Sequence, residues 1–487
     1  MRSLVALLIV ALFAAVVDAD EKSPRSQRTK ADSDWPQFRG PNCSGRAAPG
    51  DRLPEKIGPE TNVLWKIALP PGHSSPVVAG ERIYVTAERD KRLWTLALDR
   101  SDGRLLWERE AQARALETIH AIGSHAQSTP AADEERVISF FGSCGLFCYD
   151  RNGKLLWHRA MGPFKNEFGA GSSPVLSGDR VLLCQDHDQD SFLMAFDKHS
   201  GETLWKTDRS EFLRGYCTPV VWDIGGRKQV VVAGTLRVAG YDWETGKEVW
   251  TVRGIARTIC MSPVIGDNGR LYVAGWSAGG DPGAPITVEP FDPVIKRLDK
   301  NGNGKLEKSE LTSGPIAERF PQVDVDKDGS ITRAEYERFR QLFREGKNVV
   351  LAIQSGGQGD ITRSHVVWKN NRHVPFCASP LYLDGLLYTV KDGGFLASLD
   401  ANSGELVQRD RLPGSGTYYS SPVSGDGKIY IVNERGRLSI VQAGRTWRVL
   451  SSCDFGEDVY ATPAIAGGHL YVRTVGHLYC FGMPEKK

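Results

Sequence analysis

The sequence predicts an all-β fold, an eight-bladed β-propeller, with a small α-helical EF-hand insertion in its fifth blade. Three observations predict it. A Ser-Pro or Thr-Pro dipeptide recurs eight times, a turn-and-Trp pattern recurs between the dipeptides, and one interval contains two loops of calcium-binding type. Units of about 40–45 residues with four short strands are typical of propeller blades.

The dipeptides define the repeat. Their proline-to-proline steps are 54, 44, 45, 44, 117, 42 and 41 residues, so five of the seven steps lie close to one length. An ordinary β-sandwich, the alternative all-β fold, requires no such period. The eight dipeptides are Ser75-Pro76, Thr129-Pro130, Ser173-Pro174, Thr218-Pro219, Ser262-Pro263, Ser379-Pro380, Ser421-Pro422 and Thr462-Pro463.

Each unit also repeats a run ending in Asp, a turn containing Gly, and a strand that usually carries Trp. Asp and Gly favour a hairpin turn, alternating polarity favours a half-buried strand, and Trp packs between neighbouring sheets. The stretch Ser398–Val407 keeps the turn and lacks the Trp. The complete examples are Ala97–Trp107, Cys148–Trp157, Ala195–Trp205 and Gly240–Trp250.

The last unit, from Ala461, has room for three strands only. The missing fourth strand is available in Asn62–Leu69, which precedes the first Ser-Pro and carries Trp65. We expect this N-terminal strand to pair with the last blade, because the ring then has no open edge.

The A-x-D-x-x-x-G-x-x-x-W pattern resembles the pyrroloquinoline quinone (PQQ)-type propeller repeat of quinoprotein dehydrogenases and BamB-like outer-membrane assembly lipoproteins. The opening stretch Asp34–Gly45 looks like the leader segment of a bacterial branch of that superfamily. The resemblance covers most of residues 34–483 and implies the fold rather than an activity. It also implies, for the enzymes, a Cys-Cys pair, Glu and Asn calcium ligands and an Asp base. This sequence has no adjacent cysteines, so that site is not carried over.

The 117-residue step exceeds a typical step of 44 by 73 residues, and the surplus lies between Arg270–Trp276 and Lys347–Gln354. Two loops in it resemble EF-hand calcium loops, with Gly304 and Gly329 at position 6, where a sharp turn is needed. Calcium binds six to eight oxygen atoms, and Glu at position 12 binds through both of its oxygens. The predicted ligands are Asp299, Asn301, Asn303, Lys305 (backbone carbonyl) and Glu310 in loop one, and Asp324, Asp326, Asp328, Ser330 (backbone carbonyl) and Glu335 in loop two.

Leu306 and Ile331, both at position 8, are placed to pair across the two loops. A dockerin-like module also uses two such loops, but an apolar helix before each loop favours an EF-hand pair. Loop two has four carboxylates among positions 1, 3, 5 and 12 and loop one has two, so we expect the second site to be the tighter. Calcium near millimolar concentration would saturate both sites in an exported protein, which favours a structural role.

The insertion joins the second and third strands of blade five. In an antiparallel blade this connection shares a face with the segments that lead into the next blade, so we expect the EF-hand pair beside the channel mouth, where propellers bind ligands. Polar and aromatic residues of those segments form the candidate ligand site. They are His73, His125, Arg214, Arg257, His373, Tyr419, Asp458 and Tyr460, with His120, Tyr216 and Tyr418 in the same segments.

The loop Asp186–Ser191 is expected on the same face. A metal held by Asp186, His187 and Asp188 is the weaker interpretation of it, because a solvated turn explains the same residues. A carboxylate–His pair such as Asp458 with His373 has the groups for acid–base chemistry, but the sequence does not bring them together.

The predicted organisation is a signal peptide (1–19), a leader (20–61), the propeller (62–277 and 347–483) and the EF-hand pair (286–346). The apolar run Leu4–Val17 predicts export, to the periplasm or beyond, and no later segment reaches the ~18 apolar residues of a spanning helix. A net charge of +2 leaves no basic surface for nucleic acid. With nine cysteines, one or two disulfide bridges are expected, and the odd number leaves one thiol unpaired.

The preferred functional hypothesis is a soluble, exported, monomeric propeller that binds two calcium ions. It would act as a non-catalytic scaffold for a protein or small-molecule ligand at its top face, the face that carries the channel mouth. The alternative is a periplasmic PQQ-dependent dehydrogenase, or another enzyme that uses the funnel. No GxSxG, HExxH or Walker motif occurs in the sequence.

Overall fold

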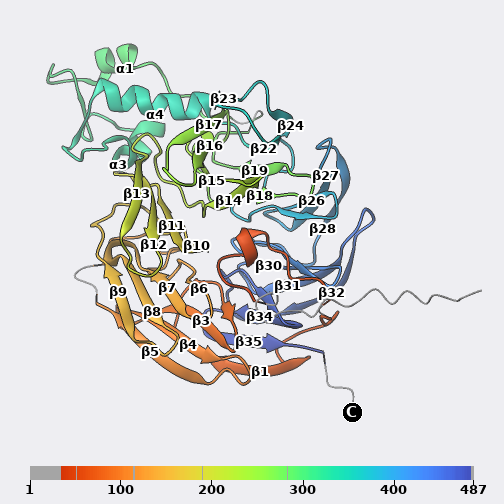
Figure 1. Cartoon of the computed structure of the whole chain (residues 1–487). Coiled ribbons are helices and arrows are strands. Elements are labelled where there is room, and N and C mark those ends of the chain that lie inside the picture. The colour runs from red at the N-terminus through yellow and green to blue at the C-terminus, as the bar shows by residue number, and fades with distance from the viewer. Residues whose placement is uncertain are drawn as a thin grey trace, which may run out of the picture.

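The computed structural model describes residues 34–50, 52–112, 116–188, 190–281, 283 and 285–483. The predicted signal peptide, residues 1–19, lies outside this range. Within it, eight antiparallel sheets follow one another in chain order around a central axis (Figure 1). The predicted eight-bladed β-propeller is therefore confirmed.

The strands of each blade are short and follow one another outward from the axis. The first four blades are β2–β5 (Val77–Ala79, Arg82–Arg89, Arg92–Asp99, Leu105–Ala111), β6–β9 (Ala131–Ala132, Arg136–Phe140, Leu146–Asp150, Leu155–Arg159), β10–β13 (Val175–Ser177, Arg180–Gln185, Phe192–Asp197, Thr203–Asp208) and β14–β17 (Val220–Ile224, Arg227–Gly234, Arg237–Asp242, Glu248–Arg253). Blade five is β18 (Val264–Ile265), β19 (Leu271–Gly275), β22 (Val349–Ile353) and β24 (Val366–Asn370), and the short β23 (Gly359–Asp360) pairs in parallel with β17.

Blades six and seven are β25–β28 (Leu381–Leu383, Leu386–Lys391, Phe395–Asp400, Leu406–Arg411) and β29–β32 (Val423–Gly425, Lys428–Val432, Arg437–Gln442, Arg448–Asp454). The last sheet contains β33 (Ala464–Ala466), β34 (His469–Arg473) and β35 (His477–Phe481). Its outer strand is β1 (Val63–Ala68), which pairs antiparallel with β35 and sets Trp65 opposite Cys480. The first strand of the described chain thus completes the last blade.

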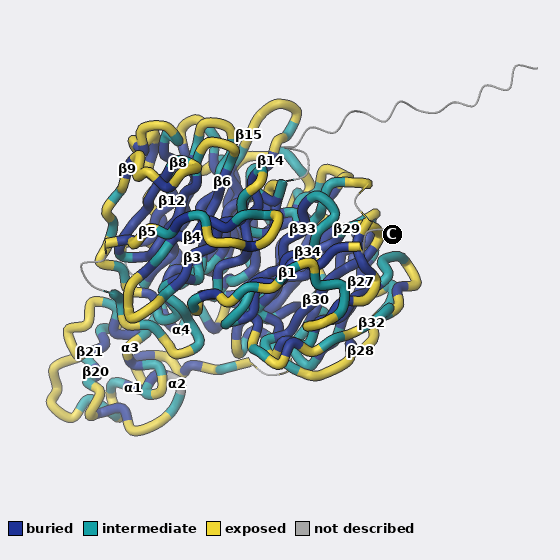
Figure 2. The backbone as a smooth tube through the Cα atoms, turned by 90° about the horizontal axis from the view of Figure 1, so that it is seen from below, coloured by how far each residue is buried: buried dark blue, intermediate teal, exposed yellow. Residues whose placement is uncertain are grey.

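The insertion lies between β19 and β22 and comprises α1 (Phe291–Leu298), β20 (Leu306–Glu307), α2 (Pro315–Glu318), α3 (Phe320–Val323), β21 (Ser330–Ile331) and α4 (Arg333–Glu345). Figure 2 shows it projecting from one end of the molecule. Its two ends are tied together, because the Asn348 side chain accepts from the Ser277 backbone N–H at 2.7 Å and donates to the Ser277 carbonyl at 3.0 Å. The insertion has its own small core, in which Phe291, Phe320 and Phe339 are buried.

The repeated Ser or Thr explains the dipeptide. The backbone N–H of each one donates to the hydroxyl oxygen of the Ser or Thr in the next blade, at 2.9–3.2 Å, and the series runs through all eight blades. The last bond, from Thr462 to Ser75, joins blade eight to blade one at 3.0 Å. We call this set the Ser/Thr ring. All eight residues are buried, so each bond satisfies a backbone donor that has no access to water.

The repeated Trp links successive blades. Trp157 of blade two donates to the Lys198 carbonyl in the turn of blade three at 2.9 Å, and its ring packs on Gly201 of that turn. Where the sequence lacks a Trp, Gln408 occupies the position and donates to the Trp447 carbonyl of blade seven at 2.9 Å. The same indole-to-carbonyl bond is made by Trp65, Trp107, Trp205 and Trp368 at 2.8–3.2 Å.

The leader crosses the end of the channel that lies opposite the insertion. Its residues bond to the inner strands of several blades: Trp35 N–H to the Val78 carbonyl at 2.9 Å, and the Gly45 carbonyl from Ser424 N–H at 2.7 Å. The Arg39 guanidinium is buried and donates to the Pro380 carbonyl at 2.6 Å. Further bonds reach Ala132, Leu176 and Val221. The leader therefore closes the channel at this end.

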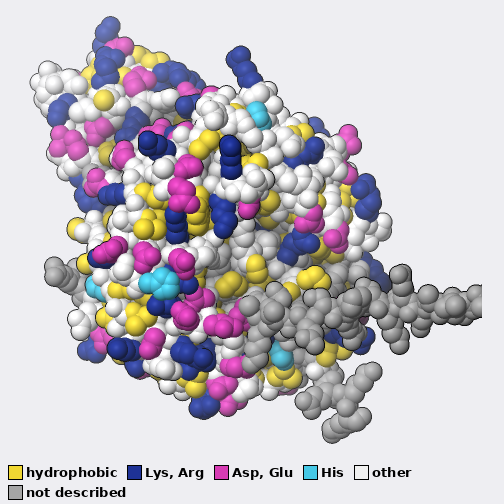
Figure 3. Space-filling model, in the orientation of Figure 1, with side chains coloured by type: hydrophobic (Ala, Val, Ile, Leu, Met, Phe, Trp, Pro, Cys, Tyr) yellow, Lys and Arg dark blue, Asp and Glu magenta, His cyan; other side chains and the backbone are white. Residues whose placement is uncertain are grey.

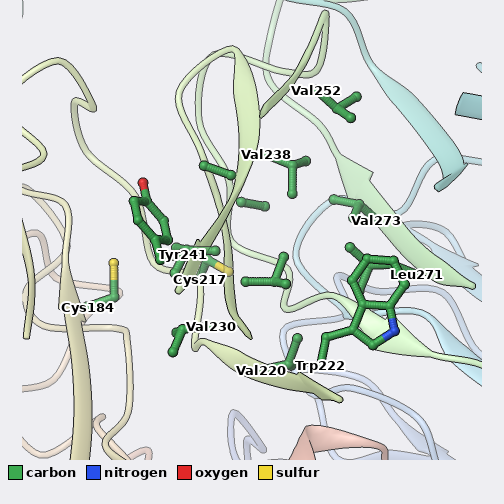
Figure 4. Packing of buried hydrophobic residues seen from close by; sticks show 14 of the residues in the cluster. Cys184, Cys217, Val220, Trp222, Val230, Val238, Tyr241, Val252, Leu271 and Val273 are labelled. Carbon is green, nitrogen blue, oxygen red and sulfur yellow. The ribbon is translucent and has the colours of Figure 1, made fainter. Parts of the chain in front are cut away.

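The largest core cluster fills the space between blades three, four and five. Figure 4 shows part of this cluster: Tyr241 and Cys217 lie toward Cys184 of blade three, and Trp222 lies toward Val273 of blade five. Cys184 and Cys217 are each 2% exposed. All nine cysteines are free thiols, so the expectation of one or two disulfide bridges is wrong for this structure. Most of them serve as small apolar residues in blade cores, as these two do.

Candidate functional site

A cavity of about 680 Å³ opens at the channel mouth, on the side of the insertion. Its wall is a ring of eight equivalent positions, each two residues before the Ser or Thr of a blade. Because every blade contributes one residue at this level, the repeat itself builds the site. The eight residues are His73, Gln127, Gly171, Tyr216, Cys260, Cys377, Tyr419 and Tyr460.

The floor and the rim of the cavity come from outside the repeats. Phe38 of the leader lines the cavity together with members of the Ser/Thr ring, so it opens toward the insertion and is closed toward the leader. The rim is supplied by the insertion, through the α2–α3 segment, the second calcium loop and α4. Those residues are Arg319, Pro321, Gln322, Val325, Lys327, Phe339 and Leu342.

One side of the wall is a continuous arc of aromatic rings. Trp276 meets Phe376 edge-on with centroids 4.7 Å apart, and Phe376 lies 6.4 Å from Tyr419. Tyr419 lies 5.7 Å from Tyr460, and Tyr460 stacks on His73 at 4.1 Å. Burial lowers the pKa of His73 to about 4, so its imidazole is neutral at pH 7 and extends the apolar arc.

The opposite side is charged. Arg214 is held by both oxygens of Asp188, each at 2.8 Å, and forms a second ion pair with Glu167. Asp188 and Glu167 are the carboxylates among the residues that line the cavity, and both are engaged by Arg214. Arg257 stands beside them with its guanidinium 4.4 Å from the ring of Phe343 in α4.

Of the predicted channel-mouth residues, the structure brings His73, Arg214, Arg257, Tyr419 and Tyr460 to this cavity, together with Tyr216. Three others lie elsewhere: the His125 ring bonds Glu88 at 3.1 Å, His373 lines a separate small cavity, and Asp458 lines neither. The suggested Asp458–His373 pair is not brought together at the cavity.

The described residues of the loop Asp186–Ser191 form no metal-binding group. Asp186 forms a buried two-bond ion pair with Arg209 at 2.7–2.8 Å, and Asp188 is bound to Arg214. His187 is 1% exposed and stacks on Phe164 at 4.1 Å. The three side chains contact different partners, so Asp186, His187 and Asp188 have a structural role in this loop.

Sequence reasoning missed several residues of the wall. Trp276, Phe376, Cys260 and Cys377 line the cavity, as does Phe38 of the leader. The sequence contains a signal for the two cysteines, because each stands two residues before the repeated Ser of a dipeptide, Ser262 or Ser379. Phe38 belongs to the leader, Trp276 follows β19 where the chain enters the insertion, and Phe376 lies between blades five and six, and no repeat pattern specifies the course of these segments.

The two calcium loops have the turn geometry of EF-hands. In loop one, Asp299 accepts backbone N–H groups from Gly302 and Gly304 at 2.7 and 2.9 Å. Glu310 at position 12 accepts from the Lys300 and Glu307 backbone at 2.7 and 3.0 Å. The loops pair through β20 and β21 with Leu306 opposite Ile331, as the sequence predicts.

Loop two brings three carboxylates together. Oxygen atoms of Asp324, Asp326 and Asp328 all lie within 4.8 Å of one another. One oxygen of Asp324, Oδ1, is buried without a hydrogen-bond partner, which fits a ligand reserved for a cation. Glu335 accepts from Val325 N–H at 2.9 Å, and Val325 lines the cavity, so the second loop is also part of its rim.

On the face seen in Figure 3, acidic and basic side chains are interspersed over the surface. None of the described helices is long and apolar enough to cross a membrane.

Comparisons with known proteins agree with this architecture. A family described as outer membrane protein assembly factor BamB matches residues 59–169 and 125–278, and the EF-hand family matches residues 291–313 and 316–339. No curated protein matches the chain.

Among solved structures, BamB from Moraxella catarrhalis is 14% identical with a TM-score of 0.52, over 87% of this chain and 97% of that one. A europium-containing methanol dehydrogenase is 12% identical with a TM-score of 0.53, over 93% and 99%. The computationally designed Ika8 protein is 11% identical with a TM-score of 0.54, over 87% and 100%. At these identities the likeness concerns the fold. The chain is thus an eight-bladed propeller in which residues 59–278 match the BamB family, and its fifth blade carries an insertion that matches the EF-hand family.

Proposed function

We propose that the protein is an exported, calcium-binding propeller that binds a ligand in the channel-mouth cavity without transforming it. The observation that carries the proposal is the cavity itself, about 680 Å³ in volume, closed by the leader and walled by one residue from each blade. Enclosed, mostly apolar cavities of this size are typical of sites for small molecules or for the side chains of a bound segment.

The EF-hand pair contributes to the same site. Residues of α3, of loop two and of α4 line the rim, and Glu335, a predicted calcium ligand, is bonded to the rim residue Val325. We propose one calcium ion in each loop, held by the ten residues predicted above. Bound calcium would fix the rim in position and so pre-organise the cavity.

The charged residues and cysteines of the cavity lining favour a ligand-binding function over a quinone-dependent enzyme. The carboxylates of the lining, Glu167 and Asp188, are both in ion pairs with Arg214, and its two cysteines, Cys260 and Cys377, are not adjacent in sequence. This lining does not fit the metal-and-disulfide site that the resemblance to quinoprotein dehydrogenases implies. The fold likeness to a methanol dehydrogenase keeps that enzyme as the alternative function.

The test uses N-phenyl-1-naphthylamine, a neutral apolar dye that fluoresces when it leaves water. We expect one dye per chain, and we expect Ala278→Trp, which adds bulk to an exposed cavity residue, to weaken binding by at least about tenfold. The matched control is Ala334→Trp on the exposed surface of α4, which should bind the dye as the wild type does.

Equal binding by the wild type and Ala278→Trp would contradict the proposal. The enzyme alternative is tested in parallel by adding PQQ and calcium to the purified protein. Stoichiometric uptake of the quinone, followed by substrate-dependent dye reduction, would replace the binding function with the enzymatic one.

A further inference from the structure

Two arginines from different parts of the chain meet at the rim of the cavity. Arg257 belongs to the segment that leads into blade five, and Arg319 belongs to the insertion, between α2 and α3. Their guanidinium groups lie 4.4 and 5.9 Å from the centroid of the same ring, Phe343 of α4. Both line the cavity. We call this junction of Arg257, Arg319 and Phe343 the seam.

The clearest imbalance of charge at the seam is at Arg257. Among the described residues, no carboxylate forms an ion pair with Arg257, and its Nε is buried without a hydrogen-bond partner. Arg319 forms an ion pair with Glu318 at 3.0 Å, and that carboxylate is 66% exposed. Burial, together with repulsion from Arg319 and Arg214, lowers the pKa of Arg257 to about 10.

The charge of the whole lining has the same sign. Its cations are Arg214, Arg257, Arg319 and Lys327, and its anions are Glu167 and Asp188, which Arg214 already engages. A partly desolvated guanidinium without a carboxylate is costly, and an oxyanion that accepts two of its N–H groups relieves that cost.

The aromatic arc faces the rest of the same cavity. Trp276, Phe376, Tyr419, Tyr460 and His73 present a run of rings along one wall, and planar apolar groups stack favourably on such rings. An occupant that satisfies both sides of the cavity has an anionic group at one end and a planar apolar body at the other.

We propose that the cavity binds a small organic oxyanion, a carboxylate, phosphate or sulfonate on a planar apolar body, with the oxyanion held at the seam between Arg257 and Arg319. The inference rests on the proposed function, because it names the ligand chemistry of the same cavity. In this arrangement the ligand contacts both the propeller and the insertion, because the propeller supplies Arg257 and the insertion supplies Arg319.

The test compares two probes with the same ring system. 8-Anilino-1-naphthalenesulfonate carries a sulfonate, and N-phenyl-1-naphthylamine is its uncharged counterpart. We expect Arg257→Gln to weaken binding of the sulfonate by about tenfold or more, with a smaller loss for Arg319→Gln, and to leave binding of the neutral dye within about twofold. Added salt should weaken only the sulfonate.

Arg92→Gln is the matched control, because Arg92 lies on the outer part of blade one with a side chain that is 64% exposed. It should change neither dissociation constant. If Arg257→Gln leaves the sulfonate constant unchanged while Ala278→Trp still weakens both dyes, the oxyanion inference is overturned and the cavity keeps its proposed function. If Ala278→Trp affects neither dye, the proposed function fails and the inference fails with it.

Discussion

The backbone N–H of Thr462 donates to the hydroxyl oxygen of Ser75 at 3.0 Å, across 387 residues of chain. This bond is the last of the eight in the Ser/Thr ring, and it joins blade eight to blade one. The ring lies directly beneath the eight residues that wall the cavity, because each wall residue precedes its Ser or Thr by two positions. The element that closes the fold therefore also sets the spacing of the candidate site.

Ser75→Ala should destabilise the protein by about 1–3 kcal/mol, because it leaves the buried Thr462 N–H without an acceptor. Ser75→Thr should cost less, since three of the ring positions are already Thr and keep the hydroxyl. The midpoint of guanidinium unfolding measures both. Equal midpoints for Ser75→Ala and the wild type would mean that the ring does not stabilise the closure.

Gly201→Ala should lower the free energy of unfolding by at least about 3 kcal/mol. This loss is larger than the cost of placing Ala at a positive φ alone. Gly201 has φ +69°, and an added Cβ would lie 2.6 Å from the Trp157 ring. Gly178→Ala is the control, because Gly178 has φ +58° with nothing within 4 Å of an added Cβ. It should cost about 1–2 kcal/mol. Similar losses in the two variants would show that the Trp contact contributes nothing.

The sequence was sufficient for the blades because their determinants are local and repeated. The turn of Asp197 to Gly201 and the Trp157 that packs on it recur at fixed spacing, so eight weak signals add up to one architecture. The EF-hand loops were predictable for the same reason, since the ligand positions follow one another within twelve residues.

The cavity was only partly predictable, because its membership depends on where irregular segments run. His125 and His373 stand close in sequence to wall residues, but neither lines the cavity. The His125 ring bonds Glu88, and His373 lines a separate small cavity. Phe38 enters the cavity because the leader crosses the channel, a course set by bonds to blades that are distant in sequence. No spacing rule in the sequence encodes that path.

Removal of one calcium ligand should remove one site. Isothermal titration calorimetry of Glu310→Gln and of Glu335→Gln should each show about one calcium fewer than the wild type, because position 12 supplies two oxygens. Glu335→Gln should abolish the tighter of the two sites, since loop two carries four carboxylates. Glu345→Gln at the end of α4, outside both loops, is the control. Unchanged stoichiometry in both variants would contradict the EF-hand assignment.

His187 should make the protein sensitive to acid. Burial lowers its pKa to about 4, against about 6.5 in the unfolded chain. Its contribution to stability is therefore complete above pH 6.5 and is lost as the pH falls toward 4, by up to about 3 kcal/mol. His187→Phe keeps the stacking on Phe164 and cannot be protonated, so its guanidinium midpoint should fall less over this range.

The exposed His199, which bonds Asp179 at 3.3 Å, provides the control for that measurement. His199→Gln should retain the acid sensitivity of the wild type. An identical pH profile for His187→Phe and the wild type would show that another group causes the loss.

We propose that the two EF-hand loops and the channel mouth form one site, because loop two supplies part of the cavity rim. The most direct measurement is the dissociation constant of 8-anilino-1-naphthalenesulfonate with about 2 mM calcium and again after chelation, for the wild type and for Glu335→Gln. We expect chelation to weaken binding of the dye by about fivefold or more in the wild type. In Glu335→Gln chelation should change the dissociation constant little, because this variant has already lost the calcium ion of loop two. Identical constants with and without calcium in the wild type would contradict the account.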